Sequence, residues 1–219
     1  MNKKILVVAA HCDDEILGCG GTMGKHVADA DEVICLILNN MNMWHGDMRP
    51  QAQAAAKIIG HKLVFANSFE DNQFDKVPLL NIVQKVEELT SRICPNIVYT
   101  HYEYDLNIDH RLTFQAVLTA FRPGNTTDIL SFEVPSSTEW ASQDRPFAPN
   151  YFVDIGGHLK DKIAAIDCYK TETAYRHDGF EYGIPHPRSP RALATRAQYW
   201  AIVTRMIAAE PFKVIRMLR

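Results

Sequence analysis

The sequence lacks the features that mark membrane, disulfide-rich and nucleic-acid-binding proteins. Its longest apolar runs, residues 4–10 and 33–38, are far below the roughly 18 residues needed to cross a bilayer, which excludes a membrane span. The five cysteines are an odd, scattered set without a Cys-x-x-Cys pair, so neither a disulfide framework nor a thiolate zinc cage is indicated. With 23 basic and 26 acidic residues, no general positive field attracts a phosphate backbone, and nucleic acid is not an expected partner.

The length and composition of the chain are those of one globular domain. The chain has 219 residues, of which 47% are hydrophobic and 22% charged, a composition typical of globular proteins. Two lysines precede the first apolar run, as in a signal peptide, but His11 and the acidic residues behind it interrupt that run. We therefore expect a buried strand in a cytoplasmic protein. Because no repeat or linker occurs, we predict a single domain over residues 1–219.

Strand and helix patterns alternate through residues 1–135. This alternation predicts βαβ units, and hence an α/β, Rossmann-like domain with a mostly parallel sheet flanked by helices. Strands are expected at residues 4–9, 33–38, 62–66, 96–101 and 129–134, which are rich in β-branched and aliphatic side chains. Helices are expected between them, at residues 21–29, 48–59, 78–93 and 109–121, with boundaries supported by proline and glycine.

After residue 135 the chain becomes more irregular. Residues 136–149 are polar and contain two prolines, which predicts a long loop, and long loops in compact domains are usually functional or mobile. The remaining C-terminal third is expected to contain a strand at residues 151–155, a helix at 160–170, a second irregular stretch at 173–190, a helix at 190–206 and a final strand at 210–217.

Two clusters of acids and histidine follow two of the predicted strands. The first is AHCDDE at residues 10–15, directly after the first strand, and the second is DLNIDHR at residues 105–111, after the fourth strand. Ligand sites in parallel sheets lie at the carboxyl ends of the strands, so both clusters can reach one site. Adjacent acids repel one another unless a cation offsets their charge. The two clusters together therefore favour a metal site.

A mixed set of imidazole and carboxylate ligands suits zinc better than calcium or magnesium. His11, Asp14 and His110 form such a set, and three ligands leave a position open for water. Asp13, close to the ion but not bound, is then the candidate general base. Helix capping is the alternative, because carboxylates are favoured where backbone N–H groups lack partners. On that interpretation the first cluster caps one helix and Asp109 is the N-cap of another.

These segments resemble the LmbE-like, or PIG-L-like, zinc-dependent N-deacetylases, whose hallmarks are AHxDDE after the first strand and a later HxDH. AHCDDE matches the first motif, and NIDH at 107–110 matches the second except at its first position. Weaker matches are the helix pattern from Arg49 to Gly60, FEDNQFD at 69–75, FEVPSSTEW at 132–140, HPRS at 186–189 and AEPF at 209–212.

The resemblance implies the ligands His11, Asp14 and His110, with Asp13 as base, in agreement with the residue-by-residue interpretation. It implies a cofactor of Zn²⁺, with Fe²⁺ as an alternative, and removal of an acetyl group from an N-acetylated amino sugar or sugar conjugate. The expected partner is thus a small glycoconjugate, and homo-oligomerisation is left open. Candidate substrate contacts are Arg49, Asp71 and His186.

The sequence departs from the family pattern at two positions. Position 12, usually proline, is Cys12, which we interpret as a tolerated small residue rather than a ligand or a redox-active thiol. Asn107 stands where many members have a histidine thought to stabilise the oxyanion or protonate the leaving amine. Asparagine can donate a hydrogen bond but cannot act as an acid. Either zinc and Asn107 polarise the carbonyl while Asp13 carries the proton to the amine, or another histidine takes that role, with His186 and His101 as candidates ahead of His177. Asp109 is expected to accept a hydrogen bond from a histidine and fix its tautomer.

Three other functions compete with this one. The departures are compatible with a degenerate member that binds metal or carbohydrate without turnover, and a hydrolase of a non-sugar amide is a rival within the enzyme class. A nucleotide-binding protein is not favoured, because the first turn is acidic and Gly18, Gly20 and Gly21 come too late to cradle a phosphate.

Overall fold

The computed structural model describes residues 2–40, 42–43, 46–122, 126–169, 180–181 and 184–218. Seven strands form one sheet: β1 (Lys4–Ala9), β2 (Glu32–Asn39), β5 (Lys62–Phe69), β6 (Ile97–His101), β7 (Asp128–Phe132), β8 (Tyr151–Asp154) and β11 (Ala209–Arg216). The helices are α1 (Asp14–Ala28), α2 (Arg49–Ile59), α3 (Leu79–Ile93), α4 (Ile108–Ala120), α5 (Leu159–Asp167) and α6 (Pro190–Thr204), with 3-10 turns η1 (Phe74–Lys76) and η2 (Thr138–Trp140). Two short hairpins pair β3 (Asn42–Met43) with β4 (Gly46–Asp47) and β9 (Phe180–Glu181) with β10 (Ile184–Pro185).

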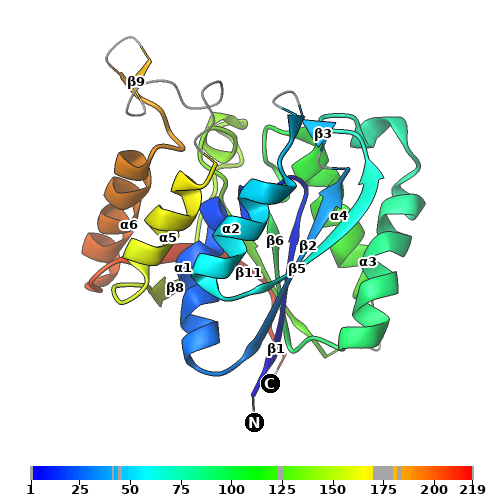
Figure 1. The fold of residues 1–219 in the computed structure, drawn as a ribbon, viewed down its shortest axis with the longest axis horizontal. Coiled ribbons are helices and arrows are strands. Elements are labelled where there is room, and N and C mark those ends of the chain that lie inside the picture. Colours follow the sequence, from blue (N-terminus) through cyan, green and yellow to red (C-terminus); the bar gives the residue numbers. More distant parts are fainter. Residues whose placement is uncertain are drawn as a thin grey trace.

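The strand order of the sheet is β5-β2-β1-β6-β7-β11-β8 (Figure 1). Neighbouring strands from β5 to β7 are parallel, and β11 is antiparallel to both of its neighbours. The chain builds outward from β1 through β2 to β5 and then returns to the other side of β1 with β6. Such a reversal of strand order opens a crevice at the carboxyl ends of the two strands, here β1 and β6.

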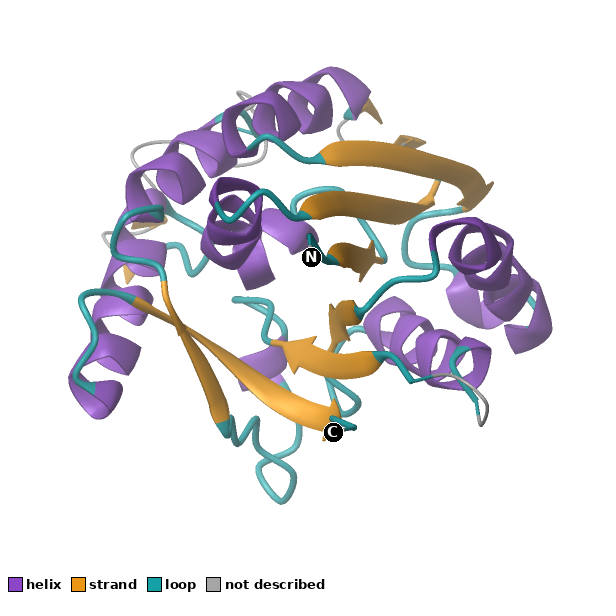
Figure 2. Ribbon diagram, turned by 90° about the horizontal axis from the view of Figure 1, so that it is seen from below, coloured by secondary structure: helices purple, strands orange, loops and turns teal. Residues whose placement is uncertain are grey.

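Helices cover both faces of the sheet. Helices α1, α2, α5 and α6 lie on one side, and α3 and α4 lie on the other (Figures 1 and 2). An apolar layer lies on each face of the sheet, and strand β1 contributes to both. Ile5 and Val7 pack on one face, and Leu6 and Val8 pack on the other. A strand buried on both faces is apolar at successive positions. The predicted α/β fold with a mostly parallel, helix-flanked sheet is confirmed.

Helix α1 differs most from its prediction. It begins at Asp14 rather than at Gly21, because the acidic residues expected in a turn form its first turn. The remaining predicted strands and helices have counterparts with shifts of a few residues at their ends. Half of the irregular stretch predicted at 173–190 lies outside the described residues.

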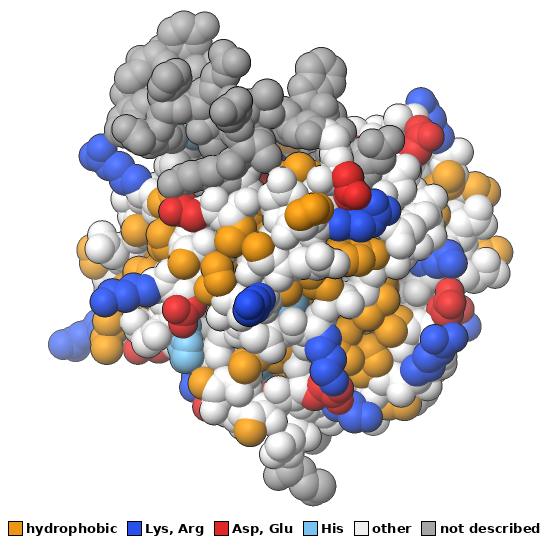
Figure 3. Space-filling model, viewed as in Figure 1, with side chains coloured by type: hydrophobic (Ala, Val, Ile, Leu, Met, Phe, Trp, Pro, Cys, Tyr) orange, Lys and Arg blue, Asp and Glu red, His pale blue; other side chains and the backbone are white. Residues whose placement is uncertain are grey.

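In the part of the chain that the structure describes, no helix has the length and hydropathy needed to cross a membrane. On the face shown in Figure 3, the basic and acidic side chains of the described residues are interspersed rather than gathered by sign.

Candidate metal centre

His11, Asp14 and His110 meet at the crevice between β1 and β6. His11 follows β1, Asp14 begins α1, and His110 lies in the first turn of α4, and all three are buried. Asp14 Oδ2 lies 3.2 Å from His11 Nδ1 and 3.2 Å from His110 Nε2, and the two nitrogens are 3.3 Å apart. A tetrahedral ion with bonds of about 2.0–2.1 Å spaces its ligand atoms by about 3.3 Å. The three side chains therefore fit one such ion.

A buried carboxylate holds the other ring nitrogen of each histidine. His11 Nε2 lies 3.0 Å from Asp109 Oδ2, and His110 Nδ1 lies 3.0 Å from Asp105 Oδ1. Such contacts fix the tautomer and the ring orientation of a ligating imidazole. Asp109 thus contacts a histidine as expected, and its other oxygen accepts the backbone N–H of Phe74 at 3.0 Å. The alternative that Asp109 is an N-cap is wrong, since Asn107 Oδ1 caps α4 by accepting the Asp109 N–H.

Asp105 is a site residue to which the sequence assigned no role of its own. Its carboxylate accepts hydrogen bonds from the hydroxyls of Ser137 and Thr138 and from the backbone N–H of Asn107. Burial raises the pKa of Asp105, but the hydrogen bond and charge of His110, together with the two hydroxyls, outweigh burial and lower it to about 2. In the sequence, Ser137 and Thr138 are marked only by the FEVPSSTEW match, which contains both of them.

The electrostatics of the cluster favour positive charge at its middle. Burial lowers the pKa of His11, but hydrogen bonds to Asp109 and Asp14 outweigh burial and raise it to about 10. Burial raises the pKa of Asp14, but the charge of His110 and the hydrogen bonds from both histidines lower it well below its usual value. A divalent cation would supply the positive charge that these carboxylates stabilise.

Asp13 lies beside the cluster in a costly backbone conformation, with φ of 84°. Arg188, in the loop before α6, donates from Nη1 to Asp13 Oδ2 at 3.1 Å and from Nε to Ser136 Oγ at 2.7 Å. Asp13 occupies the N-cap position of α1, but its side chain makes no capping hydrogen bond. The capping interpretation of the first cluster therefore fails for Asp13. The sequence indicates no role for Arg188 beyond its place in the HPRS match.

The predicted substrate-contact residues have different surroundings. Asp71 Oδ1 lies 3.3 Å from His11 Nε2, so the structure brings Asp71 to the cluster. The Arg49 guanidinium donates to Asp47, to Asn67 and to the backbone carbonyl of Asn40, joining the start of α2 to two neighbouring segments. His186 Nδ1 accepts the backbone N–H of Arg188 at 3.2 Å, which places His186 in the loop that reaches Asp13.

His101 does not suit the acid role considered for it. Its Nε2 accepts the backbone N–H of Ala10 at 2.9 Å, and its ring stacks on His110 with centroids 4.0 Å apart. Burial and the nearby charge of His110 lower the pKa of His101 well below its usual value. A neutral imidazole whose Nε2 accepts a backbone N–H has no proton to give from that nitrogen. Cys12 is buried in the core, and burial raises its pKa, as expected for a small packing residue.

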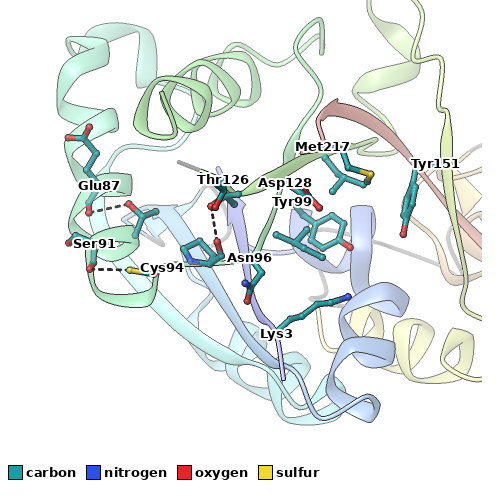
Figure 4. A pocket seen from close by; sticks show the side chains of 15 residues that line it. Lys3, Glu87, Ser91, Cys94, Asn96, Tyr99, Thr126, Asp128, Tyr151 and Met217 are labelled. Carbon is teal, nitrogen blue, oxygen red and sulfur yellow. Dashed lines mark hydrogen bonds between the residues drawn. The ribbon is translucent and has the colours of Figure 1, made fainter. Parts of the chain in front are cut away.

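A separate hollow of about 970 Å³ opens at the opposite, amino-terminal edge of the sheet (Figure 4). Lys3, Asn96, Tyr99 and Asp128 are among the residues that line it, and the three cluster residues are not. Because the acid and histidine side chains converge at the carboxyl edge, we take that edge as the candidate functional site.

Comparisons with known proteins identify a family and relatives with related sequences. Residues 6–121, more than half of the chain, match the model of a family named PIG-L and described as GlcNAc-PI de-N-acetylase. A diacetylchitobiose deacetylase of Thermococcus kodakarensis is 27% identical over 207 residues, which cover 85% of this chain and 76% of the relative. The region of this chain that the family model matches includes both acid–histidine clusters.

Solved structures share the fold at low sequence identity. A conserved protein of Thermus thermophilus superposes with a TM-score of 0.76 at 22% identity, covering 99% of this chain and 96% of that one. A 4-carboxy-2-hydroxymuconate hydratase of Pseudomonas putida superposes with a TM-score of 0.74 at 21% identity, covering 99% of this chain and 98% of that one. At these identities the likeness establishes the fold alone, and the activity has to be argued from the site.

Proposed function

This chain belongs to the PIG-L family, and we propose that it is a metal-dependent hydrolase that removes the acetyl group from an N-acetylated amino sugar or sugar conjugate. The family description and the diacetylchitobiose deacetylase similar to this chain support an N-acetylated sugar as substrate. The observation that carries the proposal is the buried triangle of His11, Asp14 and His110, in which a carboxylate holds the far nitrogen of each histidine.

We propose that His11, Asp14 and His110 hold one zinc ion, although Fe²⁺ also suits this donor set. Zinc bound there would polarise the amide carbonyl and activate water for attack. Asp109 and Asp105 keep the two imidazoles in the tautomers that direct a lone pair to the middle of the triangle.

Asp13 is the proposed general base. Its carboxylate takes the proton of the attacking water and passes it to the leaving nitrogen, so that the amine departs neutral. Arg188 holds Oδ2 of this carboxylate at 3.1 Å, which fixes the side chain beside the cluster. One carboxylate can thus serve both proton transfers without a histidine at position 107.

The polar residues around the cluster are the proposed substrate contacts. Asn107 Nδ2 donates one hydrogen to Asn72 Oδ1 at 3.0 Å, and its second hydrogen can donate to the oxygen of the reacting carbonyl. Asp71, beside His11, is the proposed acceptor for a sugar hydroxyl. We place Arg49 and His186 at the outer part of the substrate site.

The test is acetate release by the zinc-loaded chain from a panel of N-acetylated compounds. The panel contains N,N′-diacetylchitobiose, N-acetylglucosamine and an N-acetylated amino acid as a non-sugar amide. We expect acetate from at least one sugar, loss of activity with a chelator, and a decrease of about 10²–10⁴-fold in Asp13→Asn. Asp75→Asn, at an exposed position of η1, is the matched control and should remain active.

Two results would contradict the proposal. Acetate from the amino acid alone would make the chain a hydrolase of a non-sugar amide. Bound zinc with no acetate from any compound would identify a binding protein without turnover.

A further inference from the structure

Helix α1, which carries Asp14 at its first position, is broken in the middle. Cys19 has φ of −143° and ψ of 23°, which are not helical, and the helix continues beyond it. In an unbroken helix the Gly21 N–H would donate to the Leu17 carbonyl, four residues earlier. The break frees these backbone groups inside the protein, where an unpaired polar group is costly.

One buried ion pair occupies the break. Glu210 of β11 accepts the Gly21 N–H at Oε1, 2.9 Å away, and the Thr22 N–H at Oε2, 2.7 Å away. Lys162 of α5 donates from Nζ to the freed Leu17 carbonyl at 2.8 Å and to Glu210 Oε1 at 2.6 Å. The two charged side chains thus supply partners on both sides of the break and also pair with each other.

Both members of this pair are almost fully buried, with 5% of Lys162 and 2% of Glu210 exposed. Burying two charges costs free energy that their mutual attraction repays only with excellent geometry and further hydrogen bonds. A pair of apolar residues could fill this space at lower cost, but it could not hold the two broken ends of α1. The ion pair therefore stabilises the broken helix by bonding to the backbone groups at the break.

The glycines of α1 allow this arrangement. A Cβ atom at Gly20 would lie 3.3 Å from Lys162 Cγ, and one at Gly21 would lie 2.7 Å from Ile155 Cδ1. A Cβ at Gly18 would overlap the ring of Phe132, in β7. Side chains on α1 would thus displace the Lys162 stem and the elements around it. These glycines are needed for close packing at the break, which explains their number in this segment.

We propose that Lys162 and Glu210 are positioning residues for the metal centre. They fix the break at Cys19, and β1 fixes the chain before His11, so the short helical stretch from Asp14 to Gly18 is held at both ends. The direction of this stretch sets where Asp14 lies relative to the two histidines. The ion pair thereby controls metal affinity and coordination geometry, as well as the stability of the fold. This inference rests on the proposed metal centre.

The test compares cobalt binding by the wild-type chain and by Lys162→Met, Glu210→Gln and the double variant. Cobalt(II) replaces zinc in such sites, and its visible absorption reports coordination geometry. The double variant is the most informative, because it leaves no unpaired charge in the interior. Each chain is titrated in competition with a chelator, at a temperature where circular dichroism shows it fully folded.

The matched control is a second lysine–glutamate pair involving β11. Lys213 Nζ lies 2.6 Å from Glu103 Oε1, the same distance as in the buried pair, but both side chains are partly exposed and the pair supplies no hydrogen bond to the break in α1. Lys213→Met and Glu103→Gln should leave cobalt binding unchanged.

We expect the dissociation constant for cobalt to rise about tenfold or more in the Lys162 and Glu210 variants, with an altered absorption spectrum. If the folded double variant binds cobalt with wild-type affinity and spectrum, the pair is only structural and the inference is wrong, whatever happens to the melting temperature. A wild-type chain that binds no cobalt would instead contradict the proposed metal centre.

Discussion

Among single residues, Asp13 combines a strained backbone with an ion pair. Its φ of 84° and ψ of −30° lie outside the left-handed α region in which aspartate is tolerated. Such a conformation costs on the order of 1–3 kcal/mol and persists only where the surroundings impose it. Here the strained turn directs the carboxylate to Arg188 while the next residue, Asp14, faces the histidines.

The role of Arg188 can be tested by Arg188→Met, which keeps the apolar stem and removes the guanidinium. We expect kcat to fall about tenfold to a hundredfold, because Asp13 loses the partner that orients it. Zinc content should stay unchanged, because the hydrogen bonds described for the guanidinium go to Asp13, to Ser136 and to the Pro135 carbonyl. Arg92→Met, on the exposed surface of α3, is the control. An unchanged kcat, or loss of zinc from Arg188→Met, would contradict this role.

Among the secondary-structure elements, α1 depends on its glycines more than on helix propensity. We predict that Gly21→Ala lowers the free energy of unfolding by about 1–3 kcal/mol, because the added methyl overlaps Ile155. In an open helix the same change would be stabilising. Urea unfolding measures the difference. The control is Gly157→Ala, where nothing lies within 4 Å of the added Cβ. Equal stability of the two variants would contradict the packing argument.

The sequence predicts the elements whose signals are local. Strand β1 matches its predicted bounds to the residue, because burial on both faces makes it apolar throughout. The start of α1 is not predictable in this way, because consecutive acids without partners favour a turn. Their partners are His110 of α4 and Arg188 in the loop before α6, which are distant in the sequence. That Asp14 and His110 converge could be inferred, because both follow strands of one parallel sheet.

Contacts between distant segments could not be predicted in the same way. Arg188 and Asp13 are 175 residues apart in the chain, and Lys162 and Leu17 are 145 apart. A hydrogen bond between such residues leaves no periodicity or spacing in the sequence. Only the folded chain shows that a lysine in α5 completes a helix that begins at the candidate metal centre.

For the molecule as a whole, the strand order determines where the site can form. The reversal between β1 and β6 places both acid–histidine clusters at one edge of the sheet. Solved structures that share this fold include a hydratase and an N,N′-diacetylchitobiose deacetylase, so the fold alone does not define the reaction. The case for deacetylation therefore depends on family membership and on the residues at that edge.

The stability of the molecule should also respond to pH through His61, between α2 and β5. Its ring nitrogens are buried and have no hydrogen-bond partner among the described residues. Burial lowers its pKa to about 4. Below pH 6.5 the unfolded chain gains a proton that the folded chain does not bind, so the free energy of unfolding falls as the pH falls toward 4. The full effect is about 3 kcal/mol.

Urea unfolding of the wild-type chain and of His61→Leu between pH 7.5 and 4.5 measures this contribution. The variant should lose less stability than the wild type as the pH falls, with the gap opening below pH 6.5. Both chains share the candidate metal centre, so its own pH dependence cancels in the difference. Parallel curves would show that His61 gains its proton in the folded state without penalty.

The proposed function requires a single metal ion held by His11, Asp14 and His110, with Asp13 beside it. Metal analysis of the purified, zinc-loaded chain and two variants tests this directly. We predict one zinc per chain in the wild type and in Asp13→Asn, since asparagine tolerates a positive φ, and none in His110→Ala. Equal zinc content in all three chains, or equal loss from both variants, would contradict the assignment of ligands and base.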